Sequence, residues 1–250
     1  MNFLLFCLLP DMGEAQEVYR YTITYTGIPV GHTIVGIAPV PEYDGRQVYR
    51  LTVDSETNRF ASTLFKVNNR YETTVDLDSS TSLQFKAIVQ QSNLSQEVII
   101  VYDHKKGRAF RNGRPAYSIP KGVSDLFGAM FLVSKRIKKV GETCEVMVDL
   151  GGVFCRVVVD ATAVEKIRLP VGPRRAIRAK TVFEKITGDS RHRQLIDLLT
   201  NRLSKEGVVL VLWFSDDGRG TLLKASYGKR PFFATAELTR DSENSPYSHE

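Results

Sequence analysis

Hydrophobic and polar residues alternate with a period of two along most of the chain, which predicts β-strands. In Val18–Thr26, Tyr19, Tyr21, Ile23 and Tyr25 fall on one side and polar residues on the other. Similar runs, several of them separated by glycine-containing turns, predict further strands at His32–Val40, Gln47–Ser55, Leu64–Asn68, Tyr71–Leu77, Leu83–Val89, Gln96–Tyr102, Arg108–Phe110, Cys144–Asp149, Val153–Val164, Ala176–Lys185, Val208–Phe214, Thr221–Tyr227 and Phe232–Leu238. We expect a mainly β fold in which a long antiparallel meander curls into a barrel-like or sandwich sheet, because an open sheet of this size exposes unpaired edges.

Two segments break this period and predict helices. The first, at about 124–137, has Ser124 as a candidate cap, an apolar stripe from Leu126 to Ile137, and basic residues in its last turn. We expect it to pack on the sheet. The second, at about 191–206, carries a leucine stripe and a basic face and ends at Gly207. A surface helix covering one barrel end is the simplest interpretation, and a partner-docking or membrane-lying helix remains the alternative.

The N-terminal residues predict the cellular compartment of the protein. A short apolar run over residues 2–10 precedes Gly13-Glu14-Ala15, so residues 1–15 have the features of a secretory signal peptide. Lipidation of Cys7 is a competing interpretation, although Phe6 is bulky for that signal. We therefore expect an exported, periplasmic protein with one β-rich domain over 16–240 and a disordered tail over 241–250.

The distribution of charge along the chain limits the classes of partner that we expect. The 250 residues carry a formal net charge of +6, but basic residues are interspersed with acidic ones along most predicted strands. This pattern is typical of a solvated surface, so we expect no nucleic-acid partner. An anionic membrane surface stays open as a partner, and the oligomeric state stays undetermined.

The apolar run Val208–Phe214 holds the only tryptophan, Trp213, and stops at Ser215-Asp216-Asp217-Gly218. An apolar run that ends at an Asp-Gly turn predicts a central strand entering a hairpin. We expect the side chain of Trp213 to be largely buried.

Trp213 with Ser215–Arg219 resembles the closing motif of a bacterial family called domain of unknown function 3108. Matching pieces occur in order at Phe60–Thr73, Leu83–Phe85, Pro120–Asp125, Val140–Thr143 and Leu169–Gly172. The resemblance covers roughly residues 18–238 and implies an exported envelope protein with a curled antiparallel sheet, one packed helix and no catalytic residues. The helix expected near 191–206 departs from the family pattern.

A search for catalytic and metal-binding motifs gives no candidate. The four histidines are far apart, and there is no nucleophile elbow, phosphate loop or dinucleotide fingerprint. Asp216 and Asp217 could form a carboxylate pair, but an Asp-Gly turn requires such residues anyway. Asp125 is explained as an acid at the start of a helix. We assign no catalytic residue, metal ligand or cofactor.

Aromatic residues give the one indication of a ligand. Candidate ligand-binding residues are Tyr19, Tyr21, Tyr25, Phe127 and Phe131, which could line an apolar cavity inside a curled sheet or simply fill its core. The favoured function is a non-enzymatic cell-envelope protein that binds an apolar ligand, such as a lipid, or a glycan, or assists envelope assembly. The alternatives are a hydrolase of envelope polymers with carboxylates brought together by the fold, and a basic adaptor at an anionic membrane surface.

Two cysteines outside the predicted signal lie on the arms of one predicted hairpin. If the hairpin turns at Asp149–Gly152 with its centre between residues 149 and 150, Cys144 and Cys155 are directly opposite. In an oxidising compartment such a pair predicts a Cys144–Cys155 disulfide that fixes the register, with two buried free thiols as the alternative.

Overall fold

A computed structural model describes residues 17–41, 43, 45–187, 209–229 and 232–241. The predicted signal peptide at 1–15, the predicted helix at 191–206 and the predicted tail from residue 242 lie outside the described residues.

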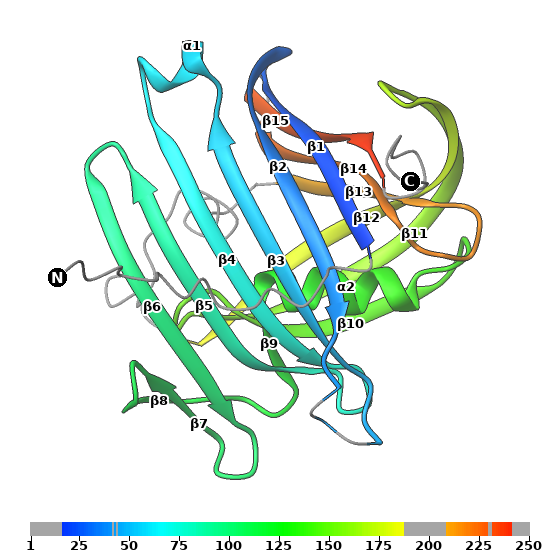
Figure 1. The fold of residues 1–250 in the computed structure, drawn as a ribbon. Coiled ribbons are helices and arrows are strands. Elements are labelled where there is room, and N and C mark those ends of the chain that lie inside the picture. The colour runs from blue at the N-terminus through cyan, green and yellow to red at the C-terminus, as the bar shows by residue number, and fades with distance from the viewer. Residues whose placement is uncertain (1–16, 42, 44, 188–208, 230–231, 242–250) are drawn as a thin grey trace, which may run out of the picture.

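Strands dominate the fold, as the alternating pattern predicts. They are β1 Glu17–Tyr25, β2 Ile28–Pro39, β3 Val48–Thr57, β4 Val67–Asp76, β5 Thr81–Gln91, β6 Leu94–Asp103, β7 Arg108–Arg111, β8 Arg114–Ser118, β9 Val123–Asp125, β10 Thr143–Asp149, β11 Phe154–Leu169, β12 Gly172–Thr187, β13 Val209–Ser215, β14 Leu222–Lys229 and β15 Phe232–Arg240, with helices α1 Arg59–Ser62 and α2 Leu126–Arg136. All belong to one sheet in the order β8-β7-β6-β5-β4-β3-β2-β1-β15-β14-β13-β12-β11-β10-β9. The mainly β fold with a meander is confirmed (Figure 1).

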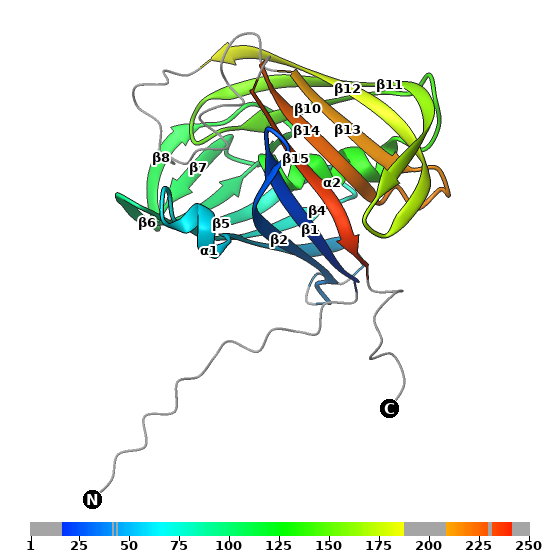
Figure 2. The same ribbon diagram turned by 90° about the horizontal axis from the view of Figure 1, so that it is seen from above.

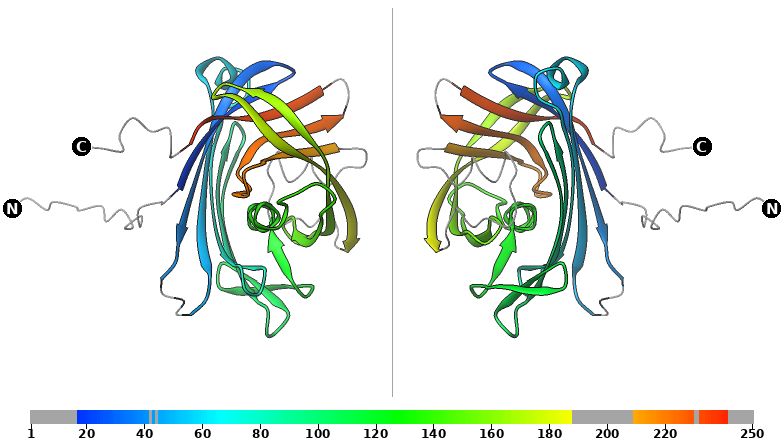
Figure 3. Two further views of the ribbon diagram at one scale, coloured as in Figure 1. Left: turned by 90° about the vertical axis from the view of Figure 1, so that its right-hand side faces the viewer. Right: turned by 90° about the vertical axis from the view of Figure 1, so that its left-hand side faces the viewer.

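The sheet curls around α2 without closing. Strands β1–β6 form one wall, strands β10–β14 lie across from it, and α2 lies between them (Figures 2 and 3). The two edge strands are β8 and β9. Pro115 in β8 cannot donate to a further strand, which discourages pairing at that edge. Near the other edge, the Ser82 N–H of β5 donates to Ser124 Oγ of β9 at 3.0 Å, which ties β9 to the opposite wall.

Helix α2 confirms the packed helix predicted for this region, with one difference at its start. Ser124 belongs to β9, and the cap is Asp125, whose carboxylate accepts from the N–H groups of Phe127 and Gly128. Ala129 and Val133 pack into the core beside β10–β13, while Phe131 packs with residues of β3 and β4. The helix is therefore buried on two sides. None of the helices among the described residues is long and apolar enough to cross a membrane.

Some strand boundaries differ from the predicted ones. Leu64–Asn68 and Tyr71–Leu77 are not two strands, because one strand, β4, runs through Asn69 and Arg70. Asn69, which resembles a turn residue in the sequence, is buried in the strand, where its side chain bonds Tyr71 and the N–H of Gln90. The short elements β8, β9 and α1 were not predicted, because each is too short to show a period.

Trp213 is intermediate in exposure and packs against a second core cluster, so it is less buried than its neighbours Leu212 and Phe214. In β13 the side chains of Leu210, Leu212 and Phe214 point into the core, so Trp213 points to the other face and is only partly buried. Its indole N–H donates to Glu165 Oε2 at 3.0 Å, and the ammonium group of Lys224 lies 5.6 Å from the ring centroid.

The predicted Cys144–Cys155 disulfide is wrong. The pairing of β10 with β11 sets Cys144 opposite Val159 and Cys155 opposite Val148. The last pair before the turn is Asp149 with Phe154, so the turn is centred two residues later than the prediction assumed. Four residues of register separate the two cysteines, roughly 13 Å along the strands. Both thiols are buried and not joined in a disulfide, which agrees with the alternative left open above.

Candidate functional site

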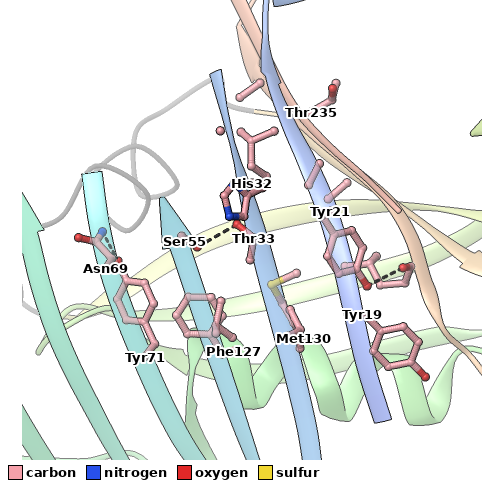
Figure 4. A pocket seen from close by; sticks show the side chains of 18 of the residues that line it. Tyr19, Tyr21, His32, Thr33, Ser55, Asn69, Tyr71, Phe127, Met130 and Thr235 are labelled. Carbon is pink, nitrogen blue, oxygen red and sulfur yellow. Dashed lines mark hydrogen bonds between the residues drawn. The ribbon is translucent and has the colours of Figure 1, made fainter. Parts of the chain in front are cut away.

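A cavity of about 970 Å³ lies inside the curled sheet and is open to solvent on one side. Its walls are the inner face of β1–β4, one side of α2, and residues of β13–β15 (Figure 4). Successive side chains of a strand point to opposite faces, so every second residue of β1–β4 faces the cavity. The volume lies at the upper end of the range typical of small-molecule sites.

All five aromatic candidates from the sequence line this cavity, namely Tyr19, Tyr21, Tyr25, Phe127 and Phe131. The lining follows β1 from Glu17 to Tyr25, a distance of about 26 Å at the rise of an extended strand. The cavity is therefore long as well as large, which suits an extended ligand.

Much of the apolar lining could not be found from the sequence. Val35, Leu51 and Val53 come from neighbouring strands, and Met130 comes from α2. Each of the strands β1–β4 contributes only two to four apolar side chains to the lining, and these resemble ordinary core residues. No local signal distinguishes them, because only the curl of the sheet leaves space in front of them.

The polar groups of the lining are largely engaged with one another. The Tyr21 hydroxyl donates to the Leu222 carbonyl at 2.8 Å, and the hydroxyls of Thr33 and Ser55 lie 2.9 Å apart. Burial, with a contribution from Glu17, raises the pKa of Tyr19 to about 12, and burial also raises the pKa of Tyr21. Both tyrosines are therefore neutral at physiological pH, and the middle of the cavity is an uncharged surface.

The two ends of the cavity differ. Charged side chains line one end, where β1 begins and α2 ends: Glu17, Lys135 and Arg219. At the other end, where β1 passes into β2 and α1 follows β3 (Figure 1), the lining includes five large apolar or aromatic side chains, those of Tyr25, Ile28, Phe60, Leu64 and Phe65, and the paired side chains of His32 and Glu56 also line the cavity. All five of these side chains are exposed to solvent. The cavity thus has one end lined by charged side chains and an open end where exposed apolar side chains predominate beside the His32–Glu56 pair.

Two buried carboxylates lie together away from the cavity. Asp125 and Asp149 are register partners on the parallel strands β9 and β10. Asp125 accepts from Ser82 Oγ at 2.6 Å and from Thr73 Oγ1, besides capping α2. Asp149 accepts from the hydroxyls of Tyr117 and Tyr102 at 2.7 and 3.1 Å and from the Gly152 N–H at 2.6 Å. No local signal in the sequence identified this pair.

These carboxylates hold the fold together and do not form a hydrolytic site. Neither Asp125 nor Asp149 lines the cavity, and both are almost completely buried. Burial raises the pKa of each carboxyl, against the opposing effect of the donated hydrogen bonds. A glycosidase needs its two carboxyl groups in a cleft that admits substrate and water, and this pair has no such access.

The other acidic and histidine residues that the sequence offered as candidates for catalysis or metal binding do not form a common site. Asp216 pairs with Arg175, whereas Asp217 accepts from Ser215 Oγ and the Arg219 N–H. Although partial burial opposes it, these hydrogen bonds lower the pKa of Asp217 to about 2. His32 pairs with Glu56 and His104 bonds the Ser82 carbonyl. In the described part of the chain, no three His, Cys, Asp or Glu side chains are grouped as metal ligands would be.

We expect the effect of Asp149→Asn on stability to depend on pH. Burial raises the folded-state pKa of Asp149 above the ordinary value of 3.8, so the protonated carboxyl stabilises the fold. This contribution is complete below pH 3.8 and is lost as the pH rises through the folded-state pKa. Asparagine stays neutral, so the variant loses no such contribution. Urea unfolding at a series of pH values should show the variant gaining stability relative to the native protein by up to about 1.4 kcal/mol per pH unit in this window. A difference that falls as pH rises would contradict the assignment.

Comparisons with known proteins agree with the fold. A family model described as a protein of unknown function (DUF3108) matches residues 20–235. A solved β-barrel-like protein of domain of unknown function DUF1849 from Brucella abortus superposes with a TM-score of 0.57 at 10% identity, covering 90% of this chain and 96% of its own. A Bacteroides fragilis protein with a YmcC-like fold, described provisionally as exported, gives a TM-score of 0.41 at 8% identity, covering 91% and 96%. No curated protein matches the sequence.

Proposed function

Because the chain belongs to the DUF3108 family, whose description assigns no function, we propose from the cavity that this protein binds a lipid or another amphiphile with a long apolar chain. We further propose that it does so as an exported, non-enzymatic protein of the cell envelope. The observation that carries the proposal is the long apolar cavity of about 970 Å³ between the wall β1–β4 and α2.

The chemistry of the lining favours an apolar chain over a glycan. A sugar brings many hydroxyl groups, and each one buried without a hydrogen-bond partner is costly. The hydroxyls of Tyr21, Thr33 and Ser55 are already engaged within the protein. An apolar chain needs no such partners and gains stability for each methylene group that leaves water.

The charged end suits the head group of an amphiphile. Lys135 lines the cavity there, and its ammonium group lies 5.0 Å from the centre of the Phe131 ring, directly beside the apolar lining. A chain that extends along β1 toward Tyr25 would place a polar or anionic head near Lys135. The ligand therefore matches the cavity at both ends.

Filling the cavity should block binding. Ala225 lines the cavity, and the adjacent Ser226 does not, since alternate residues of β14 face opposite sides. Ala225→Phe adds a ring to the space that the ligand needs, so we expect an affinity for a fluorescent fatty acid about tenfold lower or weaker still. Ser226→Phe is the matched control and should bind like the native protein. Thermal melts of both variants report whether the fold is intact.

Equal affinity of folded Ala225→Phe and the native protein would place the ligand elsewhere. Failure of the native protein to bind any long-chain amphiphile would refute the proposed function itself.

A further inference from the structure

The open end of the cavity carries an unusual group of exposed apolar side chains. We call Ile28, Phe60, Leu64 and Phe65 the apolar rim. Leu64 is 81% exposed, Phe60 66% and Ile28 56%. Three of the four lie on the short segment Arg59–Lys66, which contains α1. No residue of α1 is buried. Single exposed apolar residues are ordinary, but a group of large ones at one place marks an interaction surface.

Hydrogen bonds hold this segment in the conformation that exposes the apolar rim. Asn58 caps α1 by accepting from the Ala61 N–H at 2.8 Å, and its amide donates to the Pro29 carbonyl at 2.7 Å. The Phe65 N–H donates to the Ala61 carbonyl at 2.8 Å. The Lys66 N–H donates to Ser92 Oγ at 2.9 Å. The exposure of these side chains is therefore a property of an anchored loop, tied to β2 and to the turn after β5.

Charge around the apolar rim selects the partner. The segment Arg59–Lys66 contains two basic and no acidic residues, and both basic side chains are exposed. Glu56, the nearest acidic residue before it in the chain, pairs with His32 at 2.9 Å. Large apolar side chains flanked by lysine and arginine match the boundary between lipid head groups and acyl chains, where apolar groups enter and basic groups meet phosphate.

We propose that the apolar rim docks this protein on an anionic phospholipid membrane. Phe60, Leu64 and Phe65 line the cavity as well as the outer surface, so docking sets the open end of the cavity against the bilayer. An amphiphile can then pass between membrane and cavity without crossing water, with its head group leading toward Lys135. This transfer step rests on the proposed function, whereas the docking itself does not.

Vesicle flotation tests the docking. The probe is a set of phosphatidylcholine vesicles with and without phosphatidylglycerol. We expect the native protein to bind the anionic vesicles. Phe60→Ser with Leu64→Ser should weaken binding at least tenfold, since the side chains that enter the lipid are lost. Arg59→Gln with Lys66→Gln should weaken it about 30-fold. High salt should have the same effect as the second variant.

Matched controls carry the same chemistry elsewhere on the surface. Val101→Ser with Val182→Ser removes two exposed apolar side chains, 42% and 51% exposed, from β6 and β12. Lys105→Gln with Arg114→Gln removes two exposed charges, one from the turn between β6 and β7 and one from β8. Both controls should bind vesicles like the native protein. Because all substituted side chains are solvent-exposed, we expect the variants to fold.

The outcomes separate docking from ligand binding. Normal uptake of fatty acid from solution by the rim variants, with vesicle binding lost, supports docking. Absence of vesicle binding by the native protein overturns it, even if the fatty acid binds. Equal loss in the rim and control variants also overturns it. A further result would also overturn it. If the native protein binds no vesicles but forms a dimer in solution, and Phe60→Ser with Leu64→Ser dissociates that dimer, the apolar rim is a self-association surface.

Discussion

Asp125→Ala should lower the free energy of unfolding by about 3–5 kcal/mol. The substitution removes the cap of α2, which typically costs about 1 kcal/mol. It also removes the acceptor of the buried Ser82 hydroxyl, which costs about 1–3 kcal/mol, and leaves the buried Thr73 hydroxyl with only its longer bond of 3.3 Å to the Gln84 carbonyl. The substitution also removes the cost of burying the Asp125 carboxyl group, and this gain offsets part of the loss, which keeps the total within the stated range.

Urea unfolding at neutral pH measures this effect, with Asp54→Ala as the control. Asp54 makes only an exposed ion pair with Arg70, 3.7 Å long, so its loss should cost less than about 1 kcal/mol. Asp125→Asn keeps a capping oxygen and should fall between the alanine variant and the native protein. A loss below 1 kcal/mol for Asp125→Ala would mean that the network of Asp125, Thr73 and Ser82 does not connect α2 to the sheet.

Phe214→Ala should also cost about 3–5 kcal/mol, the usual range for a buried phenylalanine. Phe214 is 1% exposed in β13 and belongs to the core cluster that packs against α2. The neighbouring Trp213→Ala should cost less, about 1–2 kcal/mol, because its ring faces the other side and is partly exposed.

This comparison tests the orientation of β13 directly. The same urea titrations measure both variants, and the larger ring should give the smaller loss. If Trp213→Ala proves more destabilising than Phe214→Ala, the register of β13 is shifted by one residue and the inner and outer faces are exchanged.

The fold class could be predicted because its signals are local. Alternation in Val18–Thr26 depends only on neighbouring residues, and it also placed Tyr19, Tyr21 and Tyr25 on one face. The stripe from Leu126 to Ile137 predicted α2 in the same way. The face of Trp213 could not be predicted, since apolar residues occupy both faces of β13 and alternation cannot then identify the inner one. The cysteine register failed for a related reason: a shift of two residues in the centre of the turn changes every pair.

The site was only half predictable. The aromatic residues of β1 and α2 were candidates because they are large and share a face. The pairing of Asp125 with Asp149 depends on the short parallel strand β9 beside β10, and nothing near either residue indicates it. The apolar rim depends on the way a capped turn of helix presents Phe60 and Leu64, which look like strand or core residues in the sequence.

The most direct test of the proposed function is native mass spectrometry of the full-length protein expressed in a bacterial host and purified gently from its envelope. We predict a mature chain that begins near Gln16 and carries a noncovalent adduct, which releases a long-chain amphiphile on denaturation. The Ala225→Phe variant, prepared alongside, should carry little or none of it. A native protein that stays free of adduct, even after incubation with vesicles of phosphatidylcholine and phosphatidylglycerol, would contradict the proposal that the cavity holds a lipid.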